Sequence, residues 1–284
     1  MREQVPVSEA DGDEGSGGTE GGRPAEFVEA LSKGLLILES FDAQHPEMTL
    51  SDIARRLGLS PAAARRSLIT LQAMGYVGQT SKRFHLRPKV MSLGSAFYFS
   101  ARVDEVLQPE LRHLVGTFGD ASSIATLEGH EVLYVAHYSE QRARRATAVV
   151  GARYPAHATS LGRVLLAGLP DADFERYLRT MKPVPLTKKT VVDKEELRAL
   201  IEEVREKNYS TTVDQLDYGI TALAVPIRGA SGRTIAALNS SGYSGLLTAE
   251  DLVANRLQEL RSAAARLAQT LSRYPVLESI IGTR

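Results

Sequence analysis

The stretch TLSDIARRLGLSPAAARRSLITLQAMGYV, from Thr49 to Val77, decides how the first part of this chain folds. It contains two short helical patterns, Leu50 to Leu57 and Ser60 to Met74, which are joined by a turn that begins at Gly58. Two helices joined by so short a turn are typical of a helix-turn-helix motif.

Both helices carry recognisable end signals. Thr49 or Ser51 can cap the first helix, because a side-chain oxygen there accepts a hydrogen bond from a free amide of the first turn. Ser60 caps the second helix, and Pro61 suits its first position, where no amide donor is needed. Gly75 ends this helix, since glycine readily adopts the left-handed conformation that follows a helix.

The second helix has one apolar face and one face with small and basic residues. With about 100° between successive residues, Ala64, Leu68 and Leu71 point toward the core. The opposite face carries Ala62, Ala63, Arg66 and Thr70. Small side chains let a helix approach the floor of the major groove, where alanine contacts a thymine methyl and arginine reaches guanine or phosphate. The pattern therefore predicts a recognition helix, with the preceding helix lying across the DNA backbone.

Charge is distributed unevenly along the chain. The 34 basic and 34 acidic residues cancel, but residues 50–90 contain eight basic residues against a single acid, Asp52. Residues 1–26 contain seven acids against two arginines. Because a polyanion responds to the local field more than to the net charge, residues 50–90 have the charge expected of a nucleic-acid-binding segment.

The sequence YVGQTSKRFHLRP, residues 76–88, predicts a small β-hairpin after the helix pair. Its turn places Lys82 and Arg83 at the tip, where a wing meets the sugar-phosphate backbone. The helix pair alone also fits a small helical bundle with a solvated basic face, but charge, spacing and wing together favour a winged helix-turn-helix. The residues that we expect to contact double-stranded DNA are Thr49, Ser51, Ser60, Ala62, Ala63, Arg65, Arg66, Thr70, Lys82 and Arg83.

The rest of the chain predicts a second, mixed unit in an α+β protein. A first helix spans Glu26 to Phe41, with apolar residues at helical spacing, namely Phe27, Leu31, Leu35 and Leu38. A helical linker is interrupted by Gly94 and Pro109. Further on we expect a hairpin at 121–138, a strand in TAVV at 147–150, a loop entering a helix at 157–169, a helix from Lys194 to Lys207, a hairpin at 220–242 that turns at Gly229 to Gly232, and a helix capped by Thr248 that runs to Arg273.

Three segments, FVEALSKGLLILESF, the helix pair quoted above and RYPAHATSLGRVLLA, resemble the IclR family of bacterial transcription factors. The resemblance covers residues 26–275. FVEALSKGL and RRATAVVGARYPAHATSLGRVLLA further resemble the branch that regulates protocatechuate and β-ketoadipate catabolism. One departure is DQLDYG, where family members often carry two adjacent acids before the glycine. The geometry of the loop near the pocket therefore differs from the usual one.

The resemblance implies a division of the chain and a function. We expect an acidic, Gly-rich, disordered tail at 1–24, a winged helix-turn-helix at 25–88, a linker helix region at 89–118, and a GAF-like α/β effector-binding domain with an antiparallel sheet at 119–276. Family members bind operators as dimers or tetramers. The sequence leaves open which of these assemblies forms, whether RNA polymerase is a partner, and whether transcription is repressed or activated.

The segment Thr159-Ser160-Leu161-Gly162 is predicted to begin a helix, whose free amides and partial positive charge suit a small carboxylate. A plain helix cap without a ligand explains the same residues, but relatives use this segment to line the effector pocket. The expected effector-binding residues are Tyr154, Thr159, Ser160, Leu161, Gly162, Asp214, Ile220, Ala222, Asn239 and Ser241. Arg142, Arg144 and Arg145 are candidates for attracting an anion, although a charge run is usually a solvated face.

Several classes of protein are disfavoured by what the sequence lacks. There are no cysteines, so disulfides and thiolate metal sites are excluded, as in a cytoplasmic protein. No phosphate loop, HExxH or GxSxG pattern occurs, and His130 and His137 alone do not predict a metal site. We therefore expect no cofactor and no enzyme activity. An enzyme acting on a small acid and a constitutive DNA-binding structural protein remain the rival hypotheses.

Overall fold

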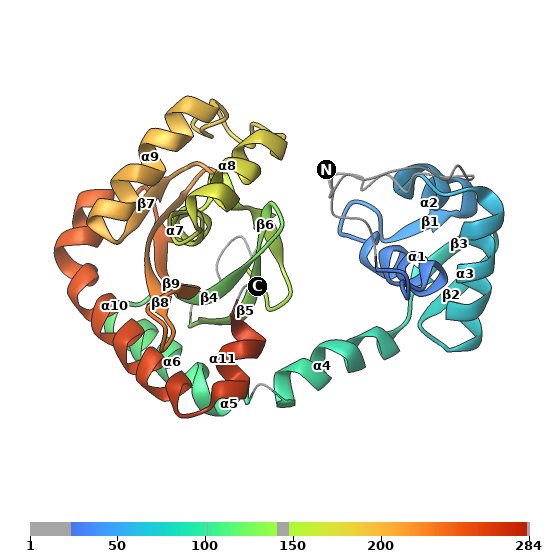
Figure 1. The fold of residues 1–284 in the computed structure, drawn as a ribbon, viewed down its shortest axis with the longest axis horizontal. Coiled ribbons are helices and arrows are strands. Elements are labelled where there is room, and N and C mark those ends of the chain that lie inside the picture. The colour runs from blue at the N-terminus through green and yellow to red at the C-terminus, as the bar shows by residue number, and fades with distance from the viewer. Residues whose placement is uncertain (1–23, 101, 141–147, 283–284) are drawn as a thin grey trace. The chain divides into compact units, whose positions relative to one another are not determined.

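The computed structural model describes residues 24–100, 102–140 and 148–282, and it divides the chain after Ala96 into two compact units (Figure 1). Each unit has its own hydrophobic core. No helix among these described ranges is long and apolar enough to span a membrane.

The N-terminal unit is a three-helix core with a small antiparallel sheet. Its helices are α1 (Glu29–Glu39), α2 (Leu50–Leu57) and α3 (Pro61–Ala73), and its strands β1 (Glu47–Thr49), β2 (Val77–Thr80) and β3 (Arg83–Leu86) lie in the order β1-β3-β2. Ile37, Ile53 and Leu68, one from each helix, are almost completely buried. The predicted winged helix-turn-helix is confirmed, while β1 was not predicted.

The predicted helix ends of this unit are confirmed in detail. Thr49 caps α2, and its hydroxyl oxygen accepts from the Asp52 amide at 3.2 Å, whereas Ser51 lies exposed within the helix. Ser60 caps α3 and accepts from the Ala63 amide at 3.3 Å. Gly75 has a φ of 80°, which a residue with a Cβ adopts only with strain.

The first helix forms as predicted, but its apolar stripe is largely exposed. Of the four apolar positions, Leu38 is buried, whereas Phe27, Leu31 and Leu35 have 41%, 62% and 47% of their surface exposed. The chain continues through the 3-10 turn η1 (Pro88–Val90) and α4 (Met91–Ser100) into α5 (Val103–Val106) and α6 (Gln108–Phe118), whose apolar residues belong to the core of the C-terminal unit. Gly94, which was expected to interrupt the linker helix, lies inside α4.

The C-terminal unit is built on a six-stranded antiparallel sheet. Its strands, in the order β6-β5-β4-β9-β8-β7, are β4 (Ala121–Glu128), β5 (Glu131–Ser139), β6 (Arg153–Pro155), β7 (Ser210–Val213), β8 (Ile220–Arg228) and β9 (Thr234–Tyr243). Both predicted hairpins are confirmed as β4–β5 and β8–β9.

The prediction of a strand in TAVV was wrong. Thr147 lies outside the described residues, and Ala148 to Val150 form no strand. The strand that follows them is β6, at Arg153–Pro155. β-Branched residues gave TAVV its strand propensity, but strand pairing depends on tertiary context and here selects the next segment.

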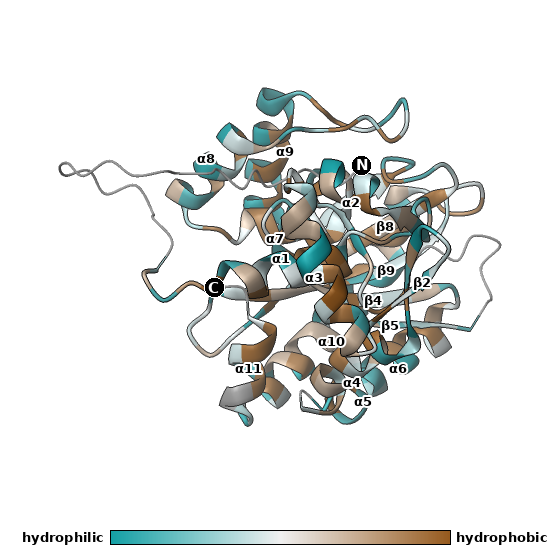
Figure 2. Cartoon of the chain, turned by 90° about the vertical axis from the view of Figure 1, so that its right-hand side faces the viewer, coloured by the Kyte–Doolittle hydropathy of each residue, from teal (hydrophilic) through white to brown (hydrophobic). Residues whose placement is uncertain are grey.

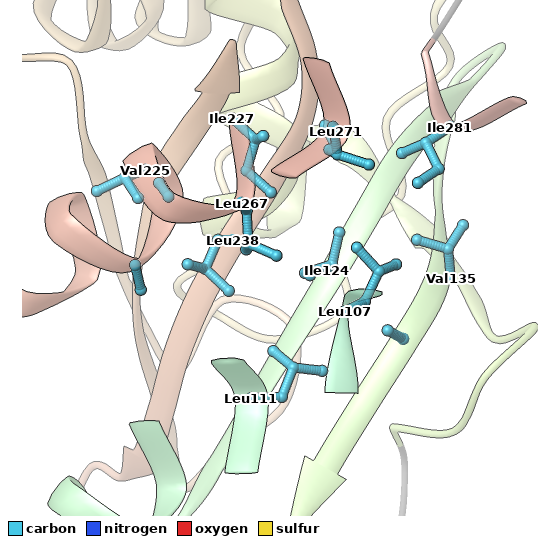
Figure 3. Packing of buried hydrophobic residues seen from close by; sticks show 14 of the residues in the cluster. Leu107, Leu111, Ile124, Val135, Val225, Ile227, Leu238, Leu267, Leu271 and Ile281 are labelled. Atoms are coloured by element: carbon cyan, nitrogen blue, oxygen red, sulfur yellow. The ribbon is translucent and has the colours of Figure 1, made fainter. Parts of the chain in front are cut away.

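Helices cover both faces of this sheet, because alternate residues along each strand point to opposite faces. One face carries Ile124, Val225 and Leu238 and packs against α6, α10 (Ala249–Ser272) and α11 (Pro275–Ile281), as Figure 3 shows for Leu111, Leu267, Leu271 and Ile281. The other face, with Ala125, Ala224 and Ala237, packs against α7 (Ser160–Ala167), α8 (Asp171–Thr180) and α9 (Lys194–Lys207). Figure 2 shows hydrophilic and hydrophobic residues alternating along α8 and α9, as expected of helices that cover a sheet. The predicted α+β fold class is confirmed.

Candidate functional site

The outward face of α3 is open and basic. Ala62, Arg65, Arg66 and Thr70 are exposed, while Ala64, Leu68 and Leu71 are buried as predicted. Ala63 does not lie on the outward face as expected, because it has only 9% of its surface exposed. It lies about 100° around the helix from Ala64, at the flank of the buried stripe, where its single methyl group is covered.

Sequence reasoning missed one residue on this face. Ile69 is 53% exposed and falls between Arg65 and Arg66 around the helix axis. An apolar side chain at this position is suited to contact a thymine methyl group in the major groove. The same helical spacing that selected Arg66 was sufficient to find it.

The four arginines of the helix pair fall into two classes. Arg55 donates to Asp52 at 3.1 Å, and Arg56, whose side chain is 19% exposed, donates to Asp42 at 2.6 Å. Arg65 and Arg66 form no ion pair within the described part of the chain. The arginines of α2 are therefore engaged in the fold, whereas those of α3 are available to an external anion.

The polar groups at the start of α2 are partly occupied. The Thr49 hydroxyl donates to the Asp52 carboxylate at 2.7 Å and its amide donates to the same group at 3.1 Å, which lowers the pKa of Asp52. Ser51 and Ser60 lie exposed beside their helix starts. At the wing, Ser81 has a φ of 56° and turns the chain so that Lys82 and Arg83 are exposed. Arg83 lies 3.5 Å from Glu47, while Lys82 forms no ion pair with a described residue.

In the C-terminal unit, the segment predicted to begin a helix does so. Thr159 caps α7 and accepts from the Gly162 amide at 2.9 Å, and Ser160 and Leu161 are buried in its first turn. A Cβ at Gly162 would lie 2.1 Å from the Ala156 carbonyl oxygen, in the short 3-10 turn η2 (Ala156–Ala158). The glycine therefore permits α7 to pack closely against the turn that precedes it.

The predicted strand residues lie together on the sheet face that α7 covers. Ala222 is a direct cross-strand partner of Ser241, and Ala224 is the partner of Asn239. Both rows share a face with Ala237, because strand residues two apart point the same way. The Asn239 side-chain oxygen accepts from the Ser123 amide at 2.8 Å.

Ser123 and His137 extend this polar row and were not predicted as effector contacts. The register aligns Ser210, Ala224, Asn239, Ser123 and His137 across five strands. The Ser123 hydroxyl lies 2.9 Å from the His137 ring, and burial lowers the pKa of His137, so its imidazole is neutral at pH 7. Polar residues within apolar β4 gave the signal that would have revealed Ser123. The row supplies neutral hydrogen-bonding groups on a face of small side chains, which suits a small polar ligand.

Tyr154, a predicted effector residue, lies apart from the polar row. Tyr154 lies in β6 and packs edge-on against Tyr134 with ring centroids 5.3 Å apart, and its partner in β5 is Val132. It is thus separated from Ser241 by β5 and β4, which lie between β6 and β9. Arg142, Arg144 and Arg145 lie outside the described residues.

Asp214 holds three loops together. Its carboxylate accepts from the Lys189 ammonium at 2.8 Å, the Ser244 hydroxyl at 2.6 Å and the Gly219 amide at 2.8 Å. These donors lower the pKa of Asp214 to about 2, so the group is ionised at neutral pH. A fixed negative charge with its acceptors occupied is suited to ordering the loops, and it repels rather than binds a carboxylate. No cluster of metal-ligating side chains occurs among the described residues.

Comparison with known proteins gives the same division of the chain. Residues 30–81 match the family described as IclR helix-turn-helix domain, and residues 98–269 match bacterial transcriptional regulator IclR C-terminal. The Pca regulon regulatory protein of Pseudomonas putida is 34% identical over 247 residues, covering 87% of this chain and 85% of that protein. The p-hydroxybenzoate hydroxylase transcriptional activator of Acinetobacter baylyi is 32% identical, covering 86% and 92%.

Solved structures are similar along the same length. A putative transcriptional regulator from Rhodococcus sp. RHA1 has a TM-score of 0.72 and 38% identity, covering 87% of this chain and 99% of that one. An IclR homolog from Microbacterium hydrocarbonoxydans, solved in complex with 4-hydroxybenzoate, has a TM-score of 0.69 and 26% identity, covering 86% and 100%. The predicted resemblance, including its branch, is confirmed by these relatives.

Proposed function

This chain belongs to the IclR family of bacterial transcriptional regulators, and we propose that it controls genes of aromatic-acid catabolism in response to a small carboxylate. It acts in the cytoplasm, on double-stranded operator DNA, and it carries out no catalytic step. The observation that carries the DNA-binding part is the pair of exposed arginines, Arg65 and Arg66, which form no ion pair with a described residue and lie on a capped helix followed by a basic wing.

The contacts with DNA are assigned from exposure and charge. α3 enters the major groove, where Ala62, Arg66 and Thr70 reach base edges and Arg65 reaches a base or a phosphate. Ser51, Ser60 and Lys82 contact the sugar-phosphate backbone, which fixes the position of the helix. Thr49 and Arg83 contribute less to DNA binding, because each already has a partner within the protein.

The effector site lies in the C-terminal unit, at the first turn of α7 and on the polar row of the sheet. Its class is proposed from two relatives, one named as the activator of p-hydroxybenzoate hydroxylase and one solved with 4-hydroxybenzoate. An aromatic acid or a β-ketoadipate pathway intermediate combines an apolar body with a carboxylate. The free amides of the α7 start and the Asn239 and Ser241 side chains supply donors for such a ligand.

We propose a homodimer as the smallest functional assembly, with a tetramer as an extension and RNA polymerase as a further partner. Phe27, Leu31 and Leu35 of the α1 segment and Met91 and Phe99 of α4 are exposed apolar side chains, and such side chains are typical of a surface that a second copy covers. A two-fold dimer places two recognition helices in successive major grooves, so the operator is a palindrome. We retain the segments 1–24, 25–88, 89–118 and 119–276 as the proposed functional divisions.

Titration of a fluorescent DNA fragment from the gene's own upstream region tests the proposal. Protocatechuate, β-ketoadipate and 4-hydroxybenzoate are each added to the full-length protein and DNA. We expect binding tighter than to scrambled DNA of the same length, and a change in affinity with one acid, because an effector acts by its different affinity for two states of the protein.

Other outcomes separate the alternatives. Specific binding that no acid changes supports a transcriptional regulator and indicates another effector and pathway. Binding no tighter than to scrambled DNA contradicts recognition of this region and favours a structural DNA-binding protein, whose affinity depends on salt alone. Consumption of an acid by purified protein favours the enzyme.

A further inference from the structure

Two arginines are buried among the described residues of the C-terminal unit, and they are satisfied in different ways. Arg256 has 6% of its surface exposed, and its guanidinium donates to the Asp120 carboxylate at 3.0 Å and to the Ser240 hydroxyl at 2.9 Å. Arg163 has 2% of its surface exposed. Removing a charge from water is costly unless an opposite charge replaces the water. Arg256 meets this requirement within the protein.

Arg163 has neutral partners only. Its Nε donates to the His157 carbonyl at 3.1 Å, and its Nη2 donates to the Gln215 side-chain oxygen. Within residues 148–282 and the other described ranges, no carboxylate forms an ion pair with Arg163, and its hydrogen bonds use Nε and Nη2 but not Nη1. Glu196 stabilises the charged form of Arg163 through its field, without forming an ion pair with it among the described residues.

Burial lowers the pKa of Arg163 to about 10, and the field of Glu196 opposes this effect only in part. At neutral pH the guanidinium therefore remains protonated. Arg163 is therefore a buried positive charge whose Nη1 donor is not used in a hydrogen bond with a described residue. An incoming anion would balance the charge and accept a hydrogen bond from this donor.

Arg163 borders a cavity of about 440 Å³ at the edge of the sheet. α9 contributes Leu200, Val204 and the ion-paired Glu203 and Lys207, α10 contributes Val253 and Glu250, and β7, the edge strand, contributes Ser210. Ligand pockets typically have volumes of roughly 300–1,000 Å³, so a single aromatic ring fits this cavity. Ser210 is also the first residue of the polar row that contains Asn239 and Ser123. The cavity therefore reaches the β7 end of this row.

We propose that Arg163 is the counter-charge that binds the carboxylate of the effector, and that the acid occupies the cavity between α9, α10 and β7, which Arg163 of α7 borders. This inference rests on the proposed function, and it adds the residue that makes the site select an acid. The polar row supplies neutral donors, which bind an acid and its neutral analogue similarly. A planar guanidinium, with paired donors and a charge, binds a carboxylate far better than an amide.

A purely structural role is the competing explanation. Arg163 connects the turn before α7 to the loop after β7 through His157 and Gln215. A clamp of this kind affects stability and lowers the affinity for all ligands alike. It does not change the preference for a charged ligand over a neutral ligand of the same shape.

Calorimetric titration of the full-length protein with 4-hydroxybenzoate and with 4-hydroxybenzamide separates the two roles. We expect wild type to prefer the acid. Arg163→Gln should bind the acid roughly 10- to 100-fold more weakly and the amide within about threefold of wild type, because only the charge-assisted bonds are lost. Arg163→Lys keeps the charge without the planar fork, and it should retain a reduced preference for the acid.

Arg205→Gln is the matched control. Arg205 lies in α9 with its side chain 25% exposed, and it pairs with Asp171 and Glu202 at the surface. This substitution should leave both affinities unchanged. An unchanged acid-to-amide ratio in Arg163→Gln overturns the inference, and if neither Arg163 variant folds, equal affinities of wild type for acid and amide overturn it. Failure of wild type to bind any of the three acids, with operator binding intact, overturns the proposed effector class and this inference with it.

Discussion

Helices α3 and α7 begin in the same way and end up in opposite environments. Ser60 caps α3 by accepting the amide of residue 63, and Thr159 caps α7 by accepting the amide of residue 162. Each helix then carries arginine within its first two turns, at Arg65 and Arg66 in α3 and at Arg163 in α7. The arginines of α3 are exposed and unpaired among the described residues, whereas Arg163 of α7 is 2% exposed.

In our proposal, burial rather than local sequence determines the role of each arginine. An exposed arginine is screened by salt and suits a polyanion, which it meets with many other charges at once. A buried arginine is barely screened and suits one small anion of defined shape. The same capped start thus serves DNA in one unit and, in our proposal, an effector in the other.

The largest expected effect is on stability and comes from a substitution at Gly162, the residue three positions after the cap of α7. The corresponding residue of α3 is Ala63. A Cβ at Gly162 would lie 2.1 Å from the Ala156 carbonyl oxygen. Gly162→Ala should lower the free energy of unfolding by about 3 kcal/mol, because backbone must move to admit the methyl group. Thermal or urea unfolding measures this.

Gly116→Ala is the control for that substitution. Gly116 lies within α6, and nothing lies within 4 Å of its added Cβ. It should raise stability by roughly 0.5–1 kcal/mol, since alanine loses less entropy than glycine in a helix. Equal effects of the two substitutions would contradict the close packing of α7 against η2.

Arg66→Ala should weaken operator binding by about 1–3 kcal/mol, whether measured by anisotropy or by gel shift, because it removes a contact to a base. Arg55→Ala is the matched change on α2, where the arginine already donates to Asp52 at 3.1 Å. It should change affinity by less than about 0.5 kcal/mol. A larger loss from Arg55→Ala than from Arg66→Ala would reverse the assignment of the two helices.

The lowered pKa of Asp214 predicts that the stability of the C-terminal unit depends on pH. Its pKa falls from the ordinary 3.8 to about 2, so its contribution to stability is complete above about pH 4 and is lost as the pH falls toward 2. With the side chain 15% exposed, we expect about 1–2 kcal/mol. Asp214→Asn should unfold more easily than wild type at pH 7, and the gap should close near pH 2. A gap that persists unchanged at pH 2 would show that the charge is not its source.

Lys82 should have the smallest effect. Its removal from the wing tip in Lys82→Ala should reduce the slope of log affinity against log salt by about 0.9, with similar losses on operator and scrambled DNA. Titrations at several salt concentrations measure the slope. A loss confined to the operator would instead indicate that Lys82 reads sequence.

Sequence predicted most of the architecture, because capping residues and glycines act locally. Thr49, Ser60, Thr159 and Thr248 each cap the helix that was expected to follow. The short strands β1 and β7 were missed, since three or four residues carry little periodicity and are stabilised by their partners.

The candidate site was predictable only in part. Helical spacing selected Arg66 correctly but placed Ala63 on the wrong side, because the edge of a buried stripe depends on what packs beside it. Arg163 stands next to the predicted HATSLG segment, yet nothing local reveals that its charge is buried beside neutral acceptors. The row from Ser210 to His137 depends on pairing between distant strands, which no single segment encodes.

One experiment tests the division of tasks most directly. Operator binding and binding of 4-hydroxybenzoate are measured on the same preparations of wild type, Arg66→Ala and Arg163→Gln. We predict that Arg66→Ala loses operator affinity and still binds the acid, while Arg163→Gln binds the operator and binds the acid roughly 10- to 100-fold more weakly. Loss of both activities in each folded variant, or loss of acid binding in Arg66→Ala alone, would contradict it.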